Sequence, residues 1–286
     1  VIIDMMGNGE LGEIHFTEPQ NFVLVNQDPA TNSCHTVSNA FEISRGANIS
    51  HIKISPGTYY ERVYVSDLGD TTQNLTLEGM GTVIIHSDTR GRPLSIENLN
   101  SNVVEELTIR NIIFEDSDNE GGGGPFFYGN INHVTLENCT IRNCGDNYPV
   151  EGAQLTESPL GLYSRVPIHI NNCDFYNNVG DQYMGAIFVA TNIETNHTII
   201  ENCRIHDNSA GNSSAIRVFG RGQFIIRNNA IHDNNQRFYG YSSCITSRDA
   251  EFVEISHNLI HNNYFPTHDQ SCSEYAIAVS RTTNNP

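Results

Sequence analysis

A ten-residue phrase that recurs in the second half of the chain constrains the fold more than any other feature. It reads IIENCRIHDN at 199–208 and returns as IIRNNAIHDN at 225–234, with weaker copies that start at positions 108, 135, 169 and 254. Apolar and polar residues alternate on both sides of a central Asn, which is typical of two short strands with one buried face. Successive copies are 26 to 34 residues apart. A repeat of this length predicts a solenoid.

A third apolar segment follows each copy of the phrase. These segments are 125–129, 161–165, 185–189, 214–218, 244–247 and 275–279. Three strands per repeat predict three parallel sheets around a stacked interior. Alternation in the third sheet predicts that Ile187, Val189, Ile216, Val218, Ile245, Ile277 and Val279 point inward. It sends Tyr163, Arg165, Phe188, Arg217, Thr246 and Ala278 outward.

The first fifty residues are expected to close one end of this solenoid. Segments 1–5 and 21–25 read as short strands, and 35–44 places Val37, Phe41 and two small residues on one helical face. A short amphipathic helix there would cover strand edges and core that are otherwise exposed to water. We therefore expect a single domain over 1–286, with 1–50 as N-terminal strands and cap and 51–286 as rungs.

The order of segments resembles a known fold family. A helix, the strand pair PGTYYERVYV, the rung LEGMGTVI and then I-x-N-N/C-x-I rungs are similar to the right-handed parallel β-helix, or pectin-lyase-like, superfamily, from about residue 35 onward. The resemblance implies an all-β, right-handed parallel β-helix with three strands per rung and a short N-terminal capping helix. It also implies that ligands bind along the third-strand sheet, in a groove walled by loops.

Signatures of the better-known enzymes with this fold are missing. The chain lacks the QDTL stretch of pectin methylesterases, the GHG and RIK of polygalacturonases and the YGFDPH-like stretch of alginate epimerases. Its one lysine, Lys53, lies in an early rung outside the expected groove, which disfavours lyases with a lysine base. The resemblance therefore implies the fold without a specific enzyme family.

The charge balance restricts the partners. The chain carries 33 Asp and Glu against 15 Lys and Arg, a formal net charge of −18. Such a surface repels nucleic acid and anionic membranes, and no apolar run reaches the roughly 18 residues of a membrane span. It suits an extracellular or cell-surface protein. The first residue is Val rather than Met, which is typical of a processed or trimmed end.

Equivalent residues in successive copies are expected to stack in columns. The central Asn of the phrase, at 111, 138, 172, 202 and 228 with His257 in the last copy, predicts a buried amide ladder. Cys139, Cys173 and Cys203 predict a column of small apolar residues, while Cys244 and Cys272 lie where they could form a disulfide. No Cys or His spacing indicates zinc.

Three histidines also align, two residues before the final Asn of each copy. His206, His232 and His261 could form a metal-binding row or a plain solvent-facing column. Adjacent rungs would place them about 5 Å apart in a straight line. That arrangement is too regular to enclose a tetrahedral metal, which favours the solvent-facing alternative.

Aromatic and arginine residues on the third sheet and its loops are the candidate binding residues. Rings offer flat faces to sugars, and guanidinium groups form bidentate contacts with carboxylates. The candidates are Tyr163, Arg165, Phe188, Arg237, Tyr239, Tyr241, His268 and Tyr275. The alternatives are an ordinary solvated sheet and, for the two last loops, a patch that contacts another protein.

An acidic loop after residue 115 is the candidate metal site. Asp116, Asp118 and Glu120 match the first half of a calcium loop, but the twelfth position is Phe127, and a flexible acidic loop is the alternative. Resemblance to pectate-lyase-like enzymes implies calcium beside the groove and an arginine base. By that resemblance, Asp181 and Arg217 form the candidate catalytic pair.

Five N-x-[ST] sequons are present. Asn48, Asn74, Asn196 and Asn212 are glycosylation candidates. Asn138 is the exception, because its expected ladder position would be buried.

Two functions from different classes remain. The first is an extracellular β-helix protein that engages an acidic polysaccharide or surface glycan, as a lyase or hydrolase or as a non-catalytic relative. The second is a structural or adhesive fibre subunit. The second is favoured by the missing catalytic motifs and by an end, SRTTNNP, that shows no capping pattern and could self-associate.

Overall fold

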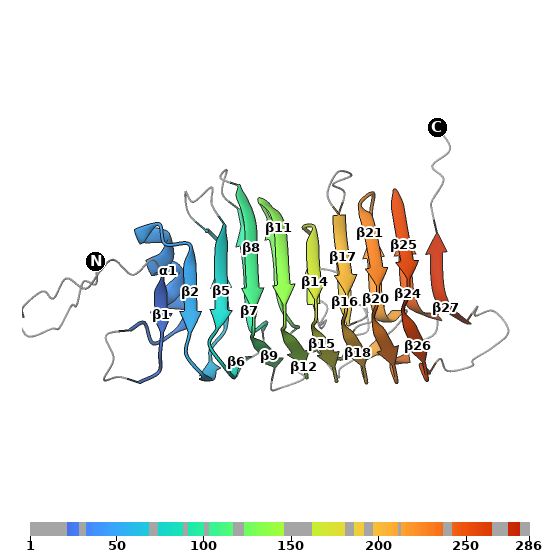
Figure 1. The fold of residues 1–286 in the computed structure, drawn as a ribbon, viewed down its shortest axis with the longest axis horizontal. Helices are drawn as coiled ribbons and strands as arrows, with labels where there is room; N and C mark the ends of the chain where they lie inside the picture. The colour runs from blue at the N-terminus through green and yellow to red at the C-terminus, as the bar shows by residue number, and fades with distance from the viewer. Residues whose placement is uncertain are drawn as a thin grey trace, which may run out of the picture.

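The chain forms a parallel β-solenoid whose axis runs from the N-terminal helix to the last strand (Figure 1). The computed structural model describes residues 22–28, 33–68, 74–87, 91–99, 103–116, 123–145, 162–180, 186–191, 197–210, 213–236, 242–264 and 274–280. Every strand pair within these ranges is parallel, and each strand pairs with its equivalents in the neighbouring rungs. The predicted all-β solenoid with three sheets and one helix is confirmed.

Three long sheets form the walls of the solenoid. Sheet A consists of β1 (Val23–Val25), β2 (His51–Ile54), β5 (Leu75–Gly79), β8 (Val104–Arg110), β11 (Ile131–Glu137), β14 (Ile168–Asn171), β17 (His197–Glu201), β21 (Gln223–Arg227) and β25 (Phe252–Ser256). Sheet B consists of β3 (Gly57–Tyr60), β6 (Val83–Ser87), β9 (Ile113–Asp116), β12 (Thr140–Arg142), β15 (Asp174–Tyr176), β18 (Arg204–His206), β22 (Ala230–His232) and β26 (Leu259–His261). Sheet C consists of β4 (Val63–Val65), β7 (Leu94–Asn98), β10 (Phe126–Gly129), β13 (Leu162–Ser164), β16 (Ile187–Ala190), β20 (Ser213–Phe219), β24 (Ser242–Arg248) and β27 (Glu274–Ser280). A small pair, β19 (Ser209–Ala210) and β23 (Asn235–Gln236), extends two of the turns.

Each repeated phrase is a strand of sheet A, a sharp corner and a strand of sheet B. The corner residue adopts a left-handed conformation, with φ from 52° to 60° at the five central Asn positions and 55° at His257. Asn tolerates this region better than other residues with a Cβ, which explains its recurrence. The Asn138 amide donates to Asn111 and accepts from Asn172, so the corner amides do form a ladder. However, Asn138 is exposed, and the expectation that this column is buried is wrong.

The buried amide ladder lies one corner further on, at the final Asn of the phrase. The Asn208 side chain donates 2.9 Å bonds to the Phe175 carbonyl and to Asn234 Oδ1, and its own oxygen accepts from Asn178. Asn234 continues the column to Asn263. These amides satisfy backbone groups inside the turn, where an unpaired polar group would be costly. The ladder predicted at the central Asn therefore forms, but the buried amides belong to this second column.

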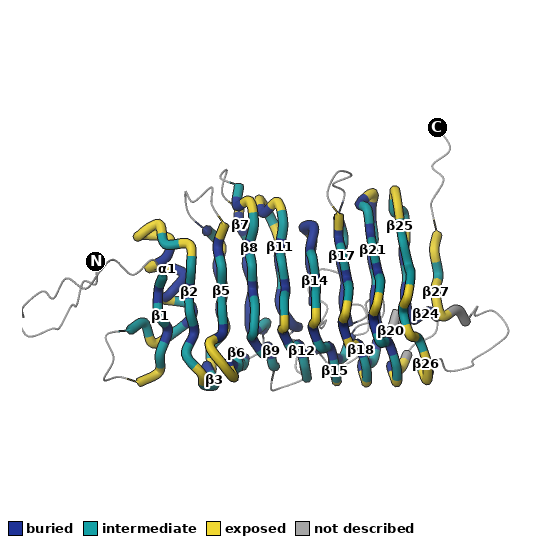
Figure 2. The backbone as a smooth tube through the Cα atoms, viewed as in Figure 1, coloured by how far each residue is buried: buried dark blue, intermediate teal, exposed yellow. Residues whose placement is uncertain are grey.

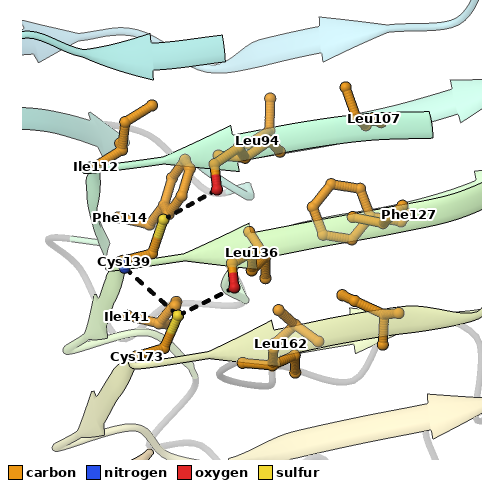
Figure 3. Close-up of a cluster of buried hydrophobic side chains, with 14 of the residues drawn as sticks. Leu94, Leu107, Ile112, Phe114, Phe127, Leu136, Cys139, Ile141, Leu162 and Cys173 are labelled. Carbon is orange, nitrogen blue, oxygen red and sulfur yellow. Dashed lines mark hydrogen bonds between the residues drawn. The ribbon is translucent and has the colours of Figure 1, made fainter. Parts of the chain in front are cut away.

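A continuous apolar core lies between the three sheets. Along many strands, buried residues alternate with less buried ones (Figure 2). Phe114 and Phe127 are fully buried in it. Cys139 and Cys173 stack at the corner, and the Cys139 amide lies 3.4 Å from the Cys173 sulfur (Figure 3). Burial raises the pKa of the Cys173 thiol well above its ordinary value. The predicted column of small core cysteines is confirmed, whereas the Cys244–Cys272 bridge falls partly outside the described residues.

Helix α1 (Val37–Ala47) covers the N-terminal end of the core, as predicted (Figure 1). Its buried face is Val37, Ala40, Phe41 and Ser44. The Glu61 carboxylate, 24 residues downstream, accepts bonds of 2.7 and 3.0 Å from the first two amides of the helix. A carboxylate at this position satisfies amides that lack partners within the helix and complements its dipole.

The last described rung is open by comparison. Ile277 and Val279 are 40% and 58% exposed, although alternation predicts that they face the core. They do lie in register with the core residues Ile245 and Ser247 of the preceding rung. Their exposure follows from the absence of a further rung over them in the described part of the chain.

Candidate functional site

A second apolar cluster lies on the outer face of sheet C, separate from the solenoid core. Tyr163 and Phe188 are its centre, each 7% exposed, and Phe126, Ala190 and Phe219 pack against them. Their neighbours along the strands, Leu162, Ile187 and Val189, belong to the solenoid core. Strand alternation therefore places the cluster on the opposite, outward side. An apolar cluster on the outer face of a solenoid wall is a feature that structural stacking alone does not require.

Register brings these rings into one column. Phe126 is paired with Tyr163, and Tyr163 with Phe188. The centroids of successive rings are 5.1 Å apart, with planes tilted by 42° at both steps. Tilted rings at this distance attract one another beyond the area they bury.

Arginine side chains lie over aromatic rings of this face, inside and beside the column, in a repeated way. The guanidinium carbon of Arg165 lies 5.5 Å from the centre of the Tyr128 ring on the rung before it. Arg217 lies over Phe188 at 6.0 Å, again on the preceding rung. Arg248 lies over Phe219 at 5.9 Å. We call these three contacts the arginine–ring pairs. The same module thus occurs three times along the solenoid axis.

Arg92 adds a fourth guanidinium to the same surface. It lies 5.2 Å from the centre of the Phe126 ring and 6.0 Å from that of Tyr163. Its Nη1 donates a 2.9 Å bond to the Gly124 carbonyl. Arg165 also lies 5.5 Å from the Tyr163 ring and donates from Nε to the Tyr163 hydroxyl. Two guanidinium groups therefore share one buried tyrosine.

This geometry changes the role expected for two predicted residues. Tyr163 and Phe188 point outward, but at 7% exposure they offer almost no free face to a sugar ring. Tyr128, at 38%, is the more accessible ring. The surface that meets solvent is a layer of guanidinium groups supported by rings. Such a layer suits ligands that carry negative charge.

Arginines on the other two sheets pair with carboxylates, and on sheet C Arg248 does so too, at 3.6 Å from Asp249, in addition to its ring. Arg142 on sheet B lies 2.9 Å from Glu115, and on sheet A Arg227 lies 2.7 Å from Glu201. Partial burial alone would raise the pKa of Glu115, but hydrogen bonds from Arg142 and Asn143 outweigh it and lower that pKa below its ordinary value. These arginines are neutralised within the solenoid.

The three aligned histidines form a stack on sheet B. Centroids are 5.1 Å apart for His206 and His232 and 5.0 Å for His232 and His261, with planes within 7° of parallel, and Tyr176 stacks on His206. The His206 side chain is only 12% exposed, and Nδ1 lies 2.7 Å from the Asp207 carboxylate. The column lies on the outer side of the sheet, as preferred, because the neighbouring Ile205 is the buried residue, although stacking leaves His206 little exposed. Parallel rings at this spacing do not converge on one point, as a metal ion would require.

Several predicted site residues lie outside the described residues. They are Asp118, Glu120, Asp181, Arg237, Tyr239, Tyr241, His268, Asn196 and Asn212. Asp116 ends β9, where it pairs with Ser87, and Tyr275 lies on β27 opposite Ser243. Asn48 and Asn74 are both exposed. The candidate pair of Asp181 with Arg217, the calcium loop and the glycosylation sites remain predictions.

Sequence reasoning placed Tyr163, Arg165, Phe188 and Arg217 together on one face, and the structure does bring them together. It missed Arg92, Phe126, Tyr128, Phe219 and Arg248. The available signal was the two-residue period of the third strands, since Phe126 and Tyr128 alternate with the core residue Phe127. The same two-residue period in the later rungs predicts that Phe219 and Arg248 also point outward.

Metal ligands and membrane spans were sought in the same described ranges. No three His, Cys, Asp or Glu side chains there come together to hold a metal ion. No helix in the described part of the chain is long and apolar enough to cross a membrane.

Comparison with known proteins supports the fold. Residues 160–286 match the family model described as "Right handed beta helix region". The three parallel sheets show the same kind of fold, a parallel β-solenoid, in the described residues before 160 as well. No curated protein matches the sequence significantly.

One solved structure is similar across most of the chain, the pectin methylesterase from Aspergillus niger. The identity is 13%, the TM-score is 0.29, and the match covers 94% of this chain and 88% of that one. Values this low transfer no activity and no functional residue.

Proposed function

We propose that this protein engages an acidic glycan outside the cell, through the outer face of sheet C. The observation that carries the proposal is the threefold repetition of the arginine–ring pairs. A repeated module along a solenoid matches a ligand that is itself a repeating polymer. Arg165 and Arg217 are two rungs apart, about 10 Å at the strand spacing, and Arg248 is one rung further, about 5 Å.

Charge supports an anionic ligand over a neutral one. The protein carries a net charge of −18, yet four of its arginines gather on this face. Guanidinium groups that lie over rings can still donate to planar carboxylates. Arg165 has no carboxylate among its described contacts, whereas Arg248 also lies 3.6 Å from the Asp249 carboxylate. A polysaccharide of uronic acids offers such carboxylates at regular intervals.

Catalysis is a further step that depends on Arg217 and Asp181. In a lyase, an arginine base would remove the proton beside the uronate carboxylate, the bond to the leaving sugar oxygen would break, and a carbon–carbon double bond would form. A non-catalytic binding protein is equally compatible with the arginine–ring pairs.

The test is incubation with a panel of uronate polysaccharides and matched neutral polymers, with and without calcium. Binding is measured by affinity electrophoresis and calorimetry, and lyase chemistry by ultraviolet absorbance of the unsaturated product. We expect binding to at least one acidic polymer and none to the neutral ones. Failure to bind any acidic polymer would refute the proposal. Absence of product, with no change in Arg217→Ala, would remove the lyase alternative alone.

A structural or adhesive subunit is the second candidate, and exposed apolar residues on the last described rung favour it. Phe252 and Leu259 are exposed there together with Ile277 and Val279. Packing against a second copy would remove this surface from water. Light scattering over a range of protein concentrations tests it. Val279→Glu should abolish association, whereas Ala278→Glu, on the opposite face of the same strand, should not.

A further inference from the structure

The hydroxyl of Tyr163 is held rigidly on the sheet C face. Its ring lies between Phe126 and Phe188, 5.1 Å from each. Only 7% of the residue is exposed, and its strand neighbours Leu162 and Ser164 are fully buried. A ring confined on both sides has little rotamer freedom to lose, so its hydroxyl oxygen defines a fixed point.

Arg165 is anchored to that point. Its Nε donates to the Tyr163 hydroxyl, and its guanidinium plane lies over the rings of Tyr163 and Tyr128 at 5.5 Å. Arg165 itself is exposed. None of its described contacts is with a carboxylate.

These contacts decide which edge of the guanidinium faces a ligand. An arginine can grip a carboxylate side-on, through Nε and one terminal nitrogen, or end-on, through both terminal nitrogens. The Tyr163 hydroxyl occupies Nε. The end-on edge, formed by Nη1 and Nη2, is the one that stays available.

We propose that Tyr163 is a positioning residue that orients the guanidinium of Arg165. Arg165 then binds the carboxylate of the ligand end-on and determines specificity for charged over esterified or neutral sugars. The proposal deepens the glycan-binding function and rests on it for the identity of the ligand. The contact between Tyr163 and Arg165 does not depend on any ligand. The two claims can therefore fail separately.

The first measurement needs no ligand. In protein labelled with ¹⁵N-arginine, the Nε–H resonance of Arg165 should exchange slowly with water, because a hydrogen bond protects it. Tyr163→Phe keeps the ring and removes the hydroxyl, and should make this proton exchange as fast as that of an exposed arginine. Tyr128→Phe is the matched control, since it removes a hydroxyl that Arg165 does not contact. Equal exchange in the wild type and in Tyr163→Phe would overturn the proposal.

The second measurement is a double-mutant cycle on binding. The probes are a uronate polymer selected by the panel above and the same polymer with its carboxyl groups methyl-esterified. Tyr163→Phe should weaken binding of the acidic form by roughly tenfold, the range of one hydrogen bond to a charged group. Binding of the esterified form should stay unchanged, as should the melting temperature.

The cycle separates positioning from general packing. In an Arg165→Ala background, Tyr163→Phe should have no further effect on the acidic polymer. An equal loss in both backgrounds, or an equal loss for both polymers, would contradict the proposal. If the wild type binds no acidic polymer, the proposed function fails, and the exchange measurement still decides whether Tyr163 aims Arg165.

Discussion

Arginines on sheets A and B differ from Arg165 and Arg217 on sheet C in what holds them, while Arg248 of sheet C combines a ring with the Asp249 carboxylate. Arg142 and Arg227 lie against carboxylates, and hydrogen bonds from these arginines help to lower the pKa of Glu115 and Glu201 despite partial burial. Arg165 and Arg217 instead lie over aromatic rings. An ion pair offsets the charge of the arginine, whereas a ring supports the guanidinium without neutralising it. The difference supports the proposal that sheets A and B stabilise the solenoid and that the sheet C face meets a ligand.

The largest expected effect comes from removing the sheet C arginines together. Each charge-assisted hydrogen bond contributes about 1.5–3 kcal/mol, so losing three arginines should weaken binding of acidic polymer by about 100-fold or more. Calorimetry measures the affinity and thermal unfolding the stability. The two triple variants to compare are Arg165→Ala/Arg217→Ala/Arg248→Ala and Arg110→Ala/Arg142→Ala/Arg227→Ala.

The second triple variant is the control for net charge, since it removes the same number of arginines from sheets A and B. It removes Arg110, Arg142 and Arg227 from ion pairs with Glu78, Glu115 and Glu201. It should therefore lower the melting temperature while affinity stays within about twofold, because screened distant charges contribute little. Similar affinities for the two triples would mean that net charge, rather than the sheet C face, determines binding.

Raising the salt concentration should reduce the affinity for the acidic polymer by a smaller factor than removing the sheet C arginines. Solvent-exposed charges are screened over about 10 Å at 0.1 M and about 3 Å at 1 M salt. Affinity for the acidic polymer should therefore fall by roughly tenfold over that range. The melting temperature of the free protein should change much less. An affinity independent of salt would argue for ring stacking as the main interaction.

Arg142 on sheet B should affect the stability of the protein and leave its affinity for the polymer unchanged. Arg142→Ala removes hydrogen bonds to Glu115 and to the Tyr176 hydroxyl, at 2.9 and 3.1 Å. Because the pair is mostly buried, we expect a loss of about 1–2 kcal/mol in the free energy of unfolding. Arg165→Ala, on an exposed face, should stay within about 0.5 kcal/mol. Chemical denaturation measures both, and a larger loss in Arg165→Ala would reverse the assignment of the two walls.

Acid provides the smallest and most selective test. The pKa of Glu115 in the folded protein lies below the ordinary value of 4.5, so the folded state binds fewer protons than the unfolded chain in acid. Its contribution to stability is complete above that value and is lost as the pH falls through the folded pKa.

We therefore expect the melting temperature to fall below about pH 4.5, less steeply in Glu115→Gln. In the Arg142→Ala background, Glu115→Gln should change the slope little, because the main group that lowers the pKa is gone. A slope that Glu115→Gln leaves unaltered in the wild-type background would show that other carboxylates govern the acid response.

The fold was predictable from the sequence because the interior obeys two simple periods. Strand alternation located the core residues Ile187 and Val189, and the helical spacing of Val37 and Phe41 located the cap. The buried amide column was misassigned because each phrase contains two Asn positions, and periodicity does not say which of them turns inward. Asn138 is exposed, whereas Asn208 is buried.

The arginine–ring pairs were harder to predict because they join different rungs. Tyr128 and Arg165 are 37 residues apart, and Phe188 and Arg217 are 29 apart. Loops of unequal length between rungs hide the register that places them together. Alternation gave the outward direction of Arg165 and Arg217 but not the ring beneath each guanidinium.

Register between rungs also means that the distance between sheet C arginines can change only in whole strand spacings. Because every rung contributes one strand to each wall, removing or duplicating one whole repeat would move the groups beyond it by a single strand spacing, about 4.8 Å. Excision of the rung that contains β16 would bring Arg165 and Arg217 onto adjacent rungs and match them to a shorter repeat unit. The number of rungs between two arginines therefore sets the distance between them along the solenoid axis.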